Sequence, residues 1–119
     1  MRSSDFRKLT VWQKAMDLAE KIYIVTLSFP KNEEFGLVSQ IRRAAVSVSS
    51  NIAEGAGRNS PKDFDKFLSI ARGSLWEISS QIELCIRLKY LNREQTYEIM
   101  SLIEEVNKMI FSLSNSLNV

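Results

Sequence analysis

The chain has 119 residues, of which 45% are hydrophobic and 25% charged, a balance typical of one compact domain covering residues 1–119. Sixteen lysines and arginines against 14 acidic residues leave a formal charge of +2, too small to identify a nucleic-acid-binding protein by itself. No histidine is present and Cys85 is the only cysteine, which excludes an intrachain disulfide, a Cys/His zinc cluster and histidine-based catalysis. We therefore expect no metal, no cofactor and no enzymatic activity. The polar N-terminus and the lack of a long apolar run favour a cytoplasmic protein without a membrane segment.

Three breaks, near residues 29–32, 55–61 and 89–92, divide the chain into four segments that are predicted to be helices, at residues 10–28, 33–54, 61–89 and 93–117. In the first helix the apolar residues recur at spacings of three and four along one face, at Trp12, Ala15, Ala19 and Ile22. Thr10 and Gln13 have the spacing of a capping box, which predicts a helix start at Thr10.

The second helix, residues 33–54, carries only two charges between Leu37 and Ala53, at Arg42 and Arg43. The glycines after residue 54 indicate its end. Its core face is followed, at about 100° per residue, by a second side that is neither charged nor bulky, formed by Ser39, Val46, Ser49, Ser50 and Ala53. This side is either covered by neighbouring helices of the same chain or forms an interface between subunits.

The third helix, residues 61–89, has Ser60 as a cap and Pro61 in its first turn, and Asn92 with Gln95 opens the fourth helix, residues 93–117. Four amphipathic helices with short connections predict an all-α fold, an antiparallel up-down-up-down four-helix bundle, with coiled-coil pairing of helical hairpins as the alternative. Gly73 and Ser74 are small residues inside the third helix. We expect them to face the serines of the second helix, in the same chain or another, unless those serines simply face water.

Glu54 lies in the last turn of the second helix, where a carboxylate meets the negative end of the helix dipole. A cation from Arg43, Arg58 or Arg72 is therefore expected beside it, with Arg43 as the first candidate for a structural ion pair.

Basic residues are frequent around the junction of the second and third helices. They form the predicted nucleic-acid-binding set, which consists of Arg42, Arg43, Arg58, Lys62, Lys66 and Arg72. A solvated, salt-bridged surface is the alternative. Five aromatic side chains could stack on bases: Trp12, Trp76, Tyr23, Tyr90 and Tyr97. Trp12 lies on the core face, which favours packing in the protein interior for most of them.

Several uncommon strings occur in a recognisable order: Leu9–Trp12, Phe29–Pro30 followed by Glu34–Leu37, Gln40–Ser47, Ser50–Gly55, and Phe67–Ser74 with Glu77. From about Phe6 to Leu91 the chain resembles the four-helix-bundle family called 23S rRNA intervening-sequence, or S23-type, proteins. It departs from that pattern at Ser49, where members often have proline.

The resemblance implies a cytoplasmic bacterial protein, encoded in some members within insertions of the large-subunit rRNA gene. The family is similar to the accessory variability protein of diversity-generating retroelements, a basic, ring-like pentamer associated with nucleic acid and reverse transcriptase. Kinship thus implies a pentamer, and five copies at +2 each would carry +10.

These observations predict a non-enzymatic, oligomeric helical bundle associated with RNA or a ribonucleoprotein. Its expected partners are further copies of the chain, RNA or DNA, and a protein. The alternative is a protein-interaction scaffold that does not bind nucleic acid.

Overall fold

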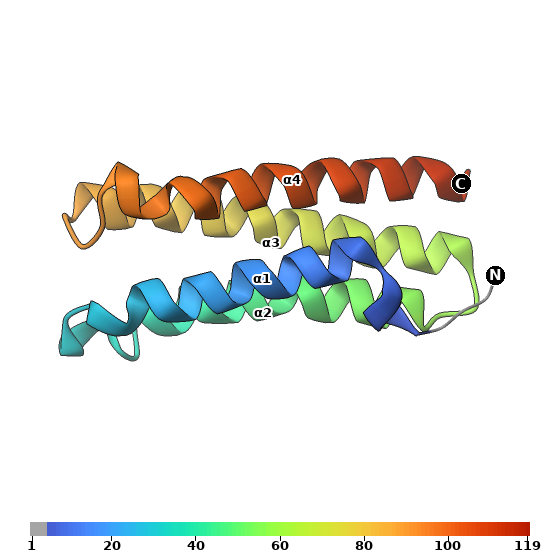
Figure 1. The fold of residues 1–119 in the computed structure, drawn as a ribbon. Helices are drawn as coiled ribbons and strands as arrows, with labels where there is room; N and C mark the ends of the chain where they lie inside the picture. The colour runs from blue at the N-terminus through green and yellow to red at the C-terminus, as the bar shows by residue number, and fades with distance from the viewer. Residues whose placement is uncertain (1–4) are drawn as a thin grey trace.

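Four long helices, joined by short connections, make up most of the computed structural model, which describes residues 5–119 (Figure 1). They are α1 (Thr10–Val25), α2 (Leu37–Ala56), α3 (Pro61–Arg87) and α4 (Arg93–Leu117). Short 3-10 turns, η1 (Phe6–Lys8), η2 (Thr26–Ser28) and η3 (Lys31–Glu33), flank α1 and precede α2. Within residues 5–119 there is no strand, which confirms the all-α prediction.

Consecutive helices run antiparallel along a bundle about 45 Å long (Figure 1). α2 packs against α1 and α3, and α4 packs against α3 and α1, so the helices close a ring in chain order. This is the predicted up-down-up-down four-helix bundle. All four helices contribute to one core, whose largest fully buried side chains include Leu18, Ile22, Ile41, Ile52, Leu75, Ile78, Ile103 and Ile110.

The connection between α1 and α2 is longer than the sequence predicted. α1 ends at Val25 and tightens into η2, where Thr26 Oγ1 donates to the carbonyl of Ile22 at 2.8 Å. α2 begins at Leu37, four residues later than expected, because the η3 turn occupies residues 31–33. Glu33 helps to start α2, since its carboxylate accepts a hydrogen bond from the amide of Leu37.

Two of the three predicted helix caps are present. Ser60 Oγ accepts from the amide of Asp63 at 3.2 Å, and Asn92 with Gln95 forms a complete capping box at the start of α4. The predicted capping box of Thr10 and Gln13 is wrong. Leu9 is the N-cap of α1, without a side-chain cap, and the side-chain amide of Gln13 donates to the carbonyl of Arg7. The preceding η1 turn brings that carbonyl within reach of Gln13, so the reciprocal bond with Thr10 does not form.

Gly55 lies inside α2 rather than marking its end. The residue is buried, and a Cβ at this position would lie 2.8 Å from both Phe64 Cδ1 and Phe67 Cβ of α3. Glycine is required here by the close approach of two helices, and α2 continues to Ala56.

The expected contact between Ser74 and the serines of α2 is made within the same chain, by Ser47. The Ser74 hydroxyl lies 2.9 Å from that of Ser47, and Asn51 donates to the backbone carbonyl of Ser47. Gly73 behaves differently, because a Cβ there would meet nothing within 4 Å.

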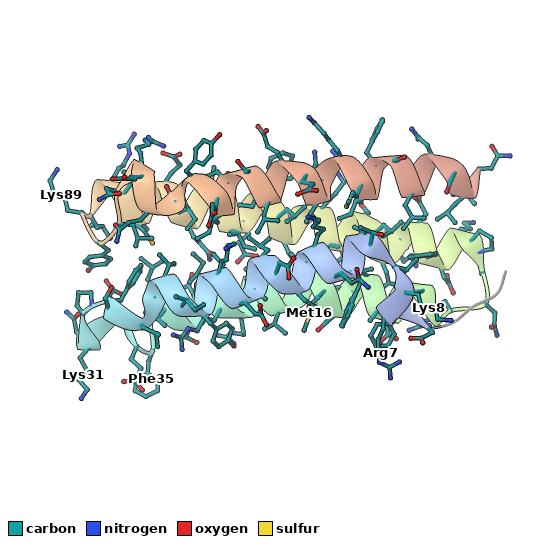
Figure 2. The ribbon with its side chains drawn as sticks, viewed as in Figure 1. Arg7, Lys8, Met16, Lys31, Phe35 and Lys89 are labelled. Atoms are coloured by element: carbon teal, nitrogen blue, oxygen red, sulfur yellow. The ribbon has the colours of Figure 1, made fainter. Side chains whose placement is uncertain are left out.

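The loop before α2 is tied to the turn between α3 and α4. Tyr90 donates to Glu33 Oε2 at 2.8 Å, and the rings of Tyr90 and Phe29 lie 5.2 Å apart. The hydrogen bond to the Glu33 carboxylate raises the pKa of Tyr90. This contact fixes one end of the bundle, where Figure 2 shows Lys31, Phe35 and Lys89 pointing outward.

Candidate functional site

An apolar groove of about 890 Å³ lies between α1 and α2. Its α2 wall is formed by Val46, Ser49, Ser50 and Ala53, and its α1 wall by Trp12, Met16, Ala19, Glu20, Tyr23 and Ile24, with Phe6 at one end. Figure 2 labels Met16 on this side of α1. We call this feature the α1–α2 groove.

Bulky apolar side chains in the groove are open to solvent. Ile24 is 67% exposed, and Tyr23 and Val46 are each 43% exposed. The small α2 residues leave room between these side chains, and Ser49 turns its hydroxyl to the carbonyl of Val46 in its own helix. The result is a hollow with an apolar lining that no element of the described chain covers.

Four of the five residues predicted to form an oligomer interface line this groove. The exception is Ser39, which lies nearer the start of α2 and accepts a hydrogen bond from Arg43 at 3.4 Å. The α1 residues Met16, Tyr23 and Ile24 were not predicted. They follow one another at helical spacing beside the core stripe, but only the packing of α1 on α2 shows that they meet the small side of α2.

Arg42 is part of the structural link between α1 and α2. Its guanidinium lies 4.5 Å from the ring centroid of Tyr23, and it donates to Thr26 Oγ1 at 3.0 Å and to the carbonyl of Tyr23. These contacts hold the C-terminal end of α1, and a phosphate at Arg42 would compete with them.

Glu54 pairs with Arg58, not with Arg43 as the leading expectation had it. The Glu54 Oε2 to Arg58 Nη2 distance is 2.8 Å, and the Arg58 guanidinium also lies 4.8 Å from the ring of Phe67. Arg58 follows Glu54 by one helical turn, whereas Arg43 lies about three turns earlier on α2, beyond the reach of the carboxylate.

The six predicted nucleic-acid-binding residues do not form one patch. Arg42 faces α1, and Arg72 reaches α4, where its Nε donates to Asn107 Oδ1 at 3.1 Å. Arg58, Lys62 and Lys66 lie near the turn between α2 and α3. Lys62 and Lys66 are exposed and take part in none of the ion pairs found within residues 5–119.

An acidic groove of about 470 Å³ lies along the surface between α1 and α4, on another side of the bundle. Two exposed ion pairs cross it, Lys14 with Glu105 at 3.4 Å and Lys21 with Glu98 at 3.1 Å. The remaining lining includes two further carboxylates, those of Asp17 and Glu20. This groove disfavours polyanions.

Cys85 is an inert thiol in this fold. It is fully buried, and burial together with the nearby Glu33 carboxylate raises its pKa to about 11, so the thiolate is scarce near neutral pH. The part of the chain that the structure describes contains no group of three or more side chains placed to hold a metal ion. None of its helices is both long and apolar enough to cross a membrane.

Comparison with known proteins agrees with the resemblance noted in the sequence. A crystal structure of a protein of unknown function from the S23 ribosomal protein family of Bacteroides thetaiotaomicron VPI-5482 superposes with a TM-score of 0.78. It is 31% identical, and the alignment covers 88% of this chain and 98% of that one. No curated protein matches the chain. The family model described as 23S rRNA-intervening sequence protein matches residues 7–112, and the chain therefore belongs to that family.

Proposed function

We propose that this chain is a self-associating, non-enzymatic four-helix bundle that associates with RNA or a ribonucleoprotein in the cytoplasm. The observation that carries the proposal is the α1–α2 groove. It leaves several apolar side chains exposed on one side of a bundle whose core is already closed. Exposed apolar surface of this kind is typical of protein–protein contacts.

Self-association is supported by the composition of the groove as well as by its exposure. Aromatic and methionine side chains are enriched at interfaces, and here they face small α2 residues that allow close approach. The resemblance to a ring-like pentamer suggests that the groove receives a different surface of the next copy, as in any cyclic assembly with more than two members.

Association with RNA is supported by the family and by charge. The family description refers to the 23S rRNA, and the related crystal structure is assigned to an S23 ribosomal protein family. Lys62 and Lys66 are free of ion pairs within the described chain, and a ring would repeat them around one rim.

A scaffold that does not bind nucleic acid is the second candidate. It is favoured by the local contacts of the predicted cations, because Arg42, Arg43, Arg58 and Arg72 all have partners within the chain. RNA phosphates would compete with these contacts for the guanidinium groups, although the contact of Arg72 uses its Nε alone.

Replacing Ser50 with glutamate tests the proposal directly. Ser50 is exposed at the groove, so Ser50→Glu should leave the fold intact while placing an unpaired charge in the interface. We expect light scattering to show a smaller particle and fluorescence anisotropy to show weaker binding to a labelled RNA, because cations of fewer copies act together. Ser101→Glu, an equal change at an exposed position of α4 in the groove between α1 and α4, is the control and should alter neither.

An unchanged mass for Ser50→Glu would contradict self-association through this groove. A parent protein that assembles but binds no RNA at low salt would contradict the RNA role and favour the scaffold.

A further inference from the structure

Two aromatic side chains on the α3–α4 face have no role in the core or in the α1–α2 groove. Trp76 of α3 is 51% exposed and Phe111 of α4 is 57% exposed. Large aromatic rings left half in water lose favourable burial, so their place on the surface calls for an explanation. The contacts between α3 and α4 show where they lie.

The register of the two helices is fixed by three side-chain contacts. Arg72 donates to Asn107 at 3.1 Å, Arg93 pairs with Glu83 at 2.8 Å, and Ser114 donates to Asp65. Trp76 lies one turn after Arg72 on α3, and Phe111 lies one turn after Asn107 on α4. Because the helices are antiparallel, the two rings flank the Arg72–Asn107 contact on opposite sides, separated by about 12 Å along the bundle.

Two cations lie beside this pair of rings. Arg72 lies between them and Lys108 follows Asn107; both are exposed. Lys108 belongs to no ion pair among residues 5–119. Glu104, one turn before Lys108, and Asp65, which accepts from Ser114, keep the charge of this face modest, so ring stacking rather than phosphate attraction must supply most of any affinity.

Gly73 leaves space beside this face. It is exposed in the middle of α3, next to Arg72, and a Cβ there would meet nothing within 4 Å. Glycine is a poor helix former, and no contact within the chain requires it here. Its position allows the backbone of a ligand to approach the helix closely.

The other partly or fully exposed aromatic residues are paired within the chain or lie elsewhere. Trp12 packs edge-on against Phe6 at 5.1 Å, Tyr90 is bonded to Glu33, and Arg42 lies over the ring of Tyr23. Phe35 is 90% exposed but lies at the end of the bundle, in the loop before α2 (Figure 2). Tyr97 is 72% exposed but lines the acidic α1–α4 groove, where phosphates are repelled.

We propose that the α3–α4 face binds single-stranded RNA, with Trp76 and Phe111 stacking on unpaired bases and Arg72 and Lys108 contacting the phosphates. Bases in a duplex are already stacked and cannot reach the rings, which is why the ligand is a single strand. The inference rests on the RNA association proposed above and names the form of RNA and the residues that read it.

The test measures binding of a labelled oligouridylate of about ten nucleotides, and of a duplex RNA of the same length, by fluorescence anisotropy. Trp76→Ala and Phe111→Ala should each weaken single-strand binding at least about five-fold and leave duplex binding unchanged. Trp76→Leu should lose as much as Trp76→Ala, because it keeps an apolar side chain but no ring. Tyr97→Ala is the matched control and should bind like the parent.

Trp76→Phe supplies a second measurement. It should retain most of the affinity and lose the quenching of tryptophan fluorescence that RNA causes in the parent. Circular dichroism and light scattering confirm that each variant keeps its fold and mass.

Three outcomes would overturn the inference. If the parent binds RNA and both alanine variants bind it equally well, RNA lies elsewhere and the proposed function stands. If Trp76→Leu binds like the parent, or single strands and duplexes weaken together, the ring does not stack on bases. If the parent binds neither RNA at low salt, the proposed RNA association fails and this inference fails with it.

Discussion

Gly55 and Gly73 are both helical, yet their surroundings are opposite. Gly55 is buried where α2 and α3 nearly touch, with Phe64 and Phe67 against its Cα. Gly73 is exposed on α3 and has open space where a side chain would be. The same residue type therefore reflects close packing at one position and an unfilled surface at the other.

Alanine substitutions at these two positions should have opposite effects on the free energy of unfolding. Gly73→Ala should increase it by about 1 kcal/mol, because alanine is the better helix former and meets no obstacle. Gly55→Ala should decrease it by about 1 to 3 kcal/mol, because the added methyl group forces α2 and α3 apart. Urea denaturation followed by circular dichroism measures both changes. A loss of stability in Gly73→Ala would show that the space beside α3 is filled in the folded protein.

The helices begin in different ways, and the difference lies in side-chain hydrogen bonds. α4 starts with a reciprocal capping box between Asn92 and Gln95. α1 follows the N-cap Leu9, whose side chain caps nothing, and the carbonyl of Arg7 in the η1 turn accepts from the side-chain amide of Gln13 instead. A capping-box spacing therefore corresponds to a real cap in only one of these two helices.

Removing the two candidate caps distinguishes them experimentally. Asn92→Ala should destabilise the protein by about 1 kcal/mol, because the amide of Gln95 loses its acceptor. Thr10→Ala should change stability little, since Thr10 is the first residue of α1 rather than its cap. Thermal unfolding monitored by circular dichroism measures both, and equal destabilisation of the two variants would contradict the assignment of Leu9 as the N-cap.

The helical periods and the local caps could be predicted from the sequence because they depend on neighbouring residues. The start of α4 at Arg93 and the Ser60 cap of α3 are examples. The end of α2 was predicted too early because Gly55 was interpreted locally, as a helix stop, whereas its role depends on Phe64 and Phe67 of another helix.

Only the α2 wall of the α1–α2 groove could be predicted, because the other wall depends on packing between helices. The small side of α2, including Val46 and Ser50, is a property of one helix and is visible in the sequence. The α1 wall depends on how α1 rotates when it packs against α2, and this rotation decides which of its apolar residues remain exposed. The partner of Glu54 shows the same limit, since several arginines were candidates and only geometry selects Arg58.

Over the whole molecule, the apolar groove and the proposed RNA-binding face belong to different helix pairs. The groove lies on α1 and α2, and the rings of Trp76 and Phe111 lie on α3 and α4. The acidic groove lies between α1 and α4, on a third side of the bundle. In a ring, the groove of one copy receives a second surface of the next copy, so the α3–α4 face is free for RNA when that second surface lies elsewhere on the bundle.

The cations at the α2–α3 end should contribute to RNA binding through charge alone. We expect Lys62→Ala combined with Lys66→Ala to weaken binding about equally across unrelated sequences, because phosphates carry no base identity. The slope of log Kd against log salt should fall by about 0.7 for each phosphate of a single strand that the variant no longer neutralises. Anisotropy titrations at several salt concentrations measure this slope.

Lys31→Ala combined with Lys89→Ala is the control, since it removes the same charge from the opposite end of the bundle (Figure 2). Equal losses of affinity in the two double variants would mean that net charge, rather than the position of Lys62 and Lys66, governs binding.

The closed arrangement of the four helices within one chain also bears on the order in which they dock during folding. Consecutive helices are joined by short turns, but α1 meets α4 across almost the whole chain, and Lys21 and Glu98 of that seam are 77 positions apart. Closing a long segment costs more entropy than closing a short one, so α1 docks on α4 last. The two ion pairs that cross this seam are exposed and add little stability, so we expect the α1–α4 seam to open before the helix pairs that are joined by turns. Such opening leaves the α1–α2 and α3–α4 hairpins each intact, so a molecule that opens briefly can close again without losing either proposed surface.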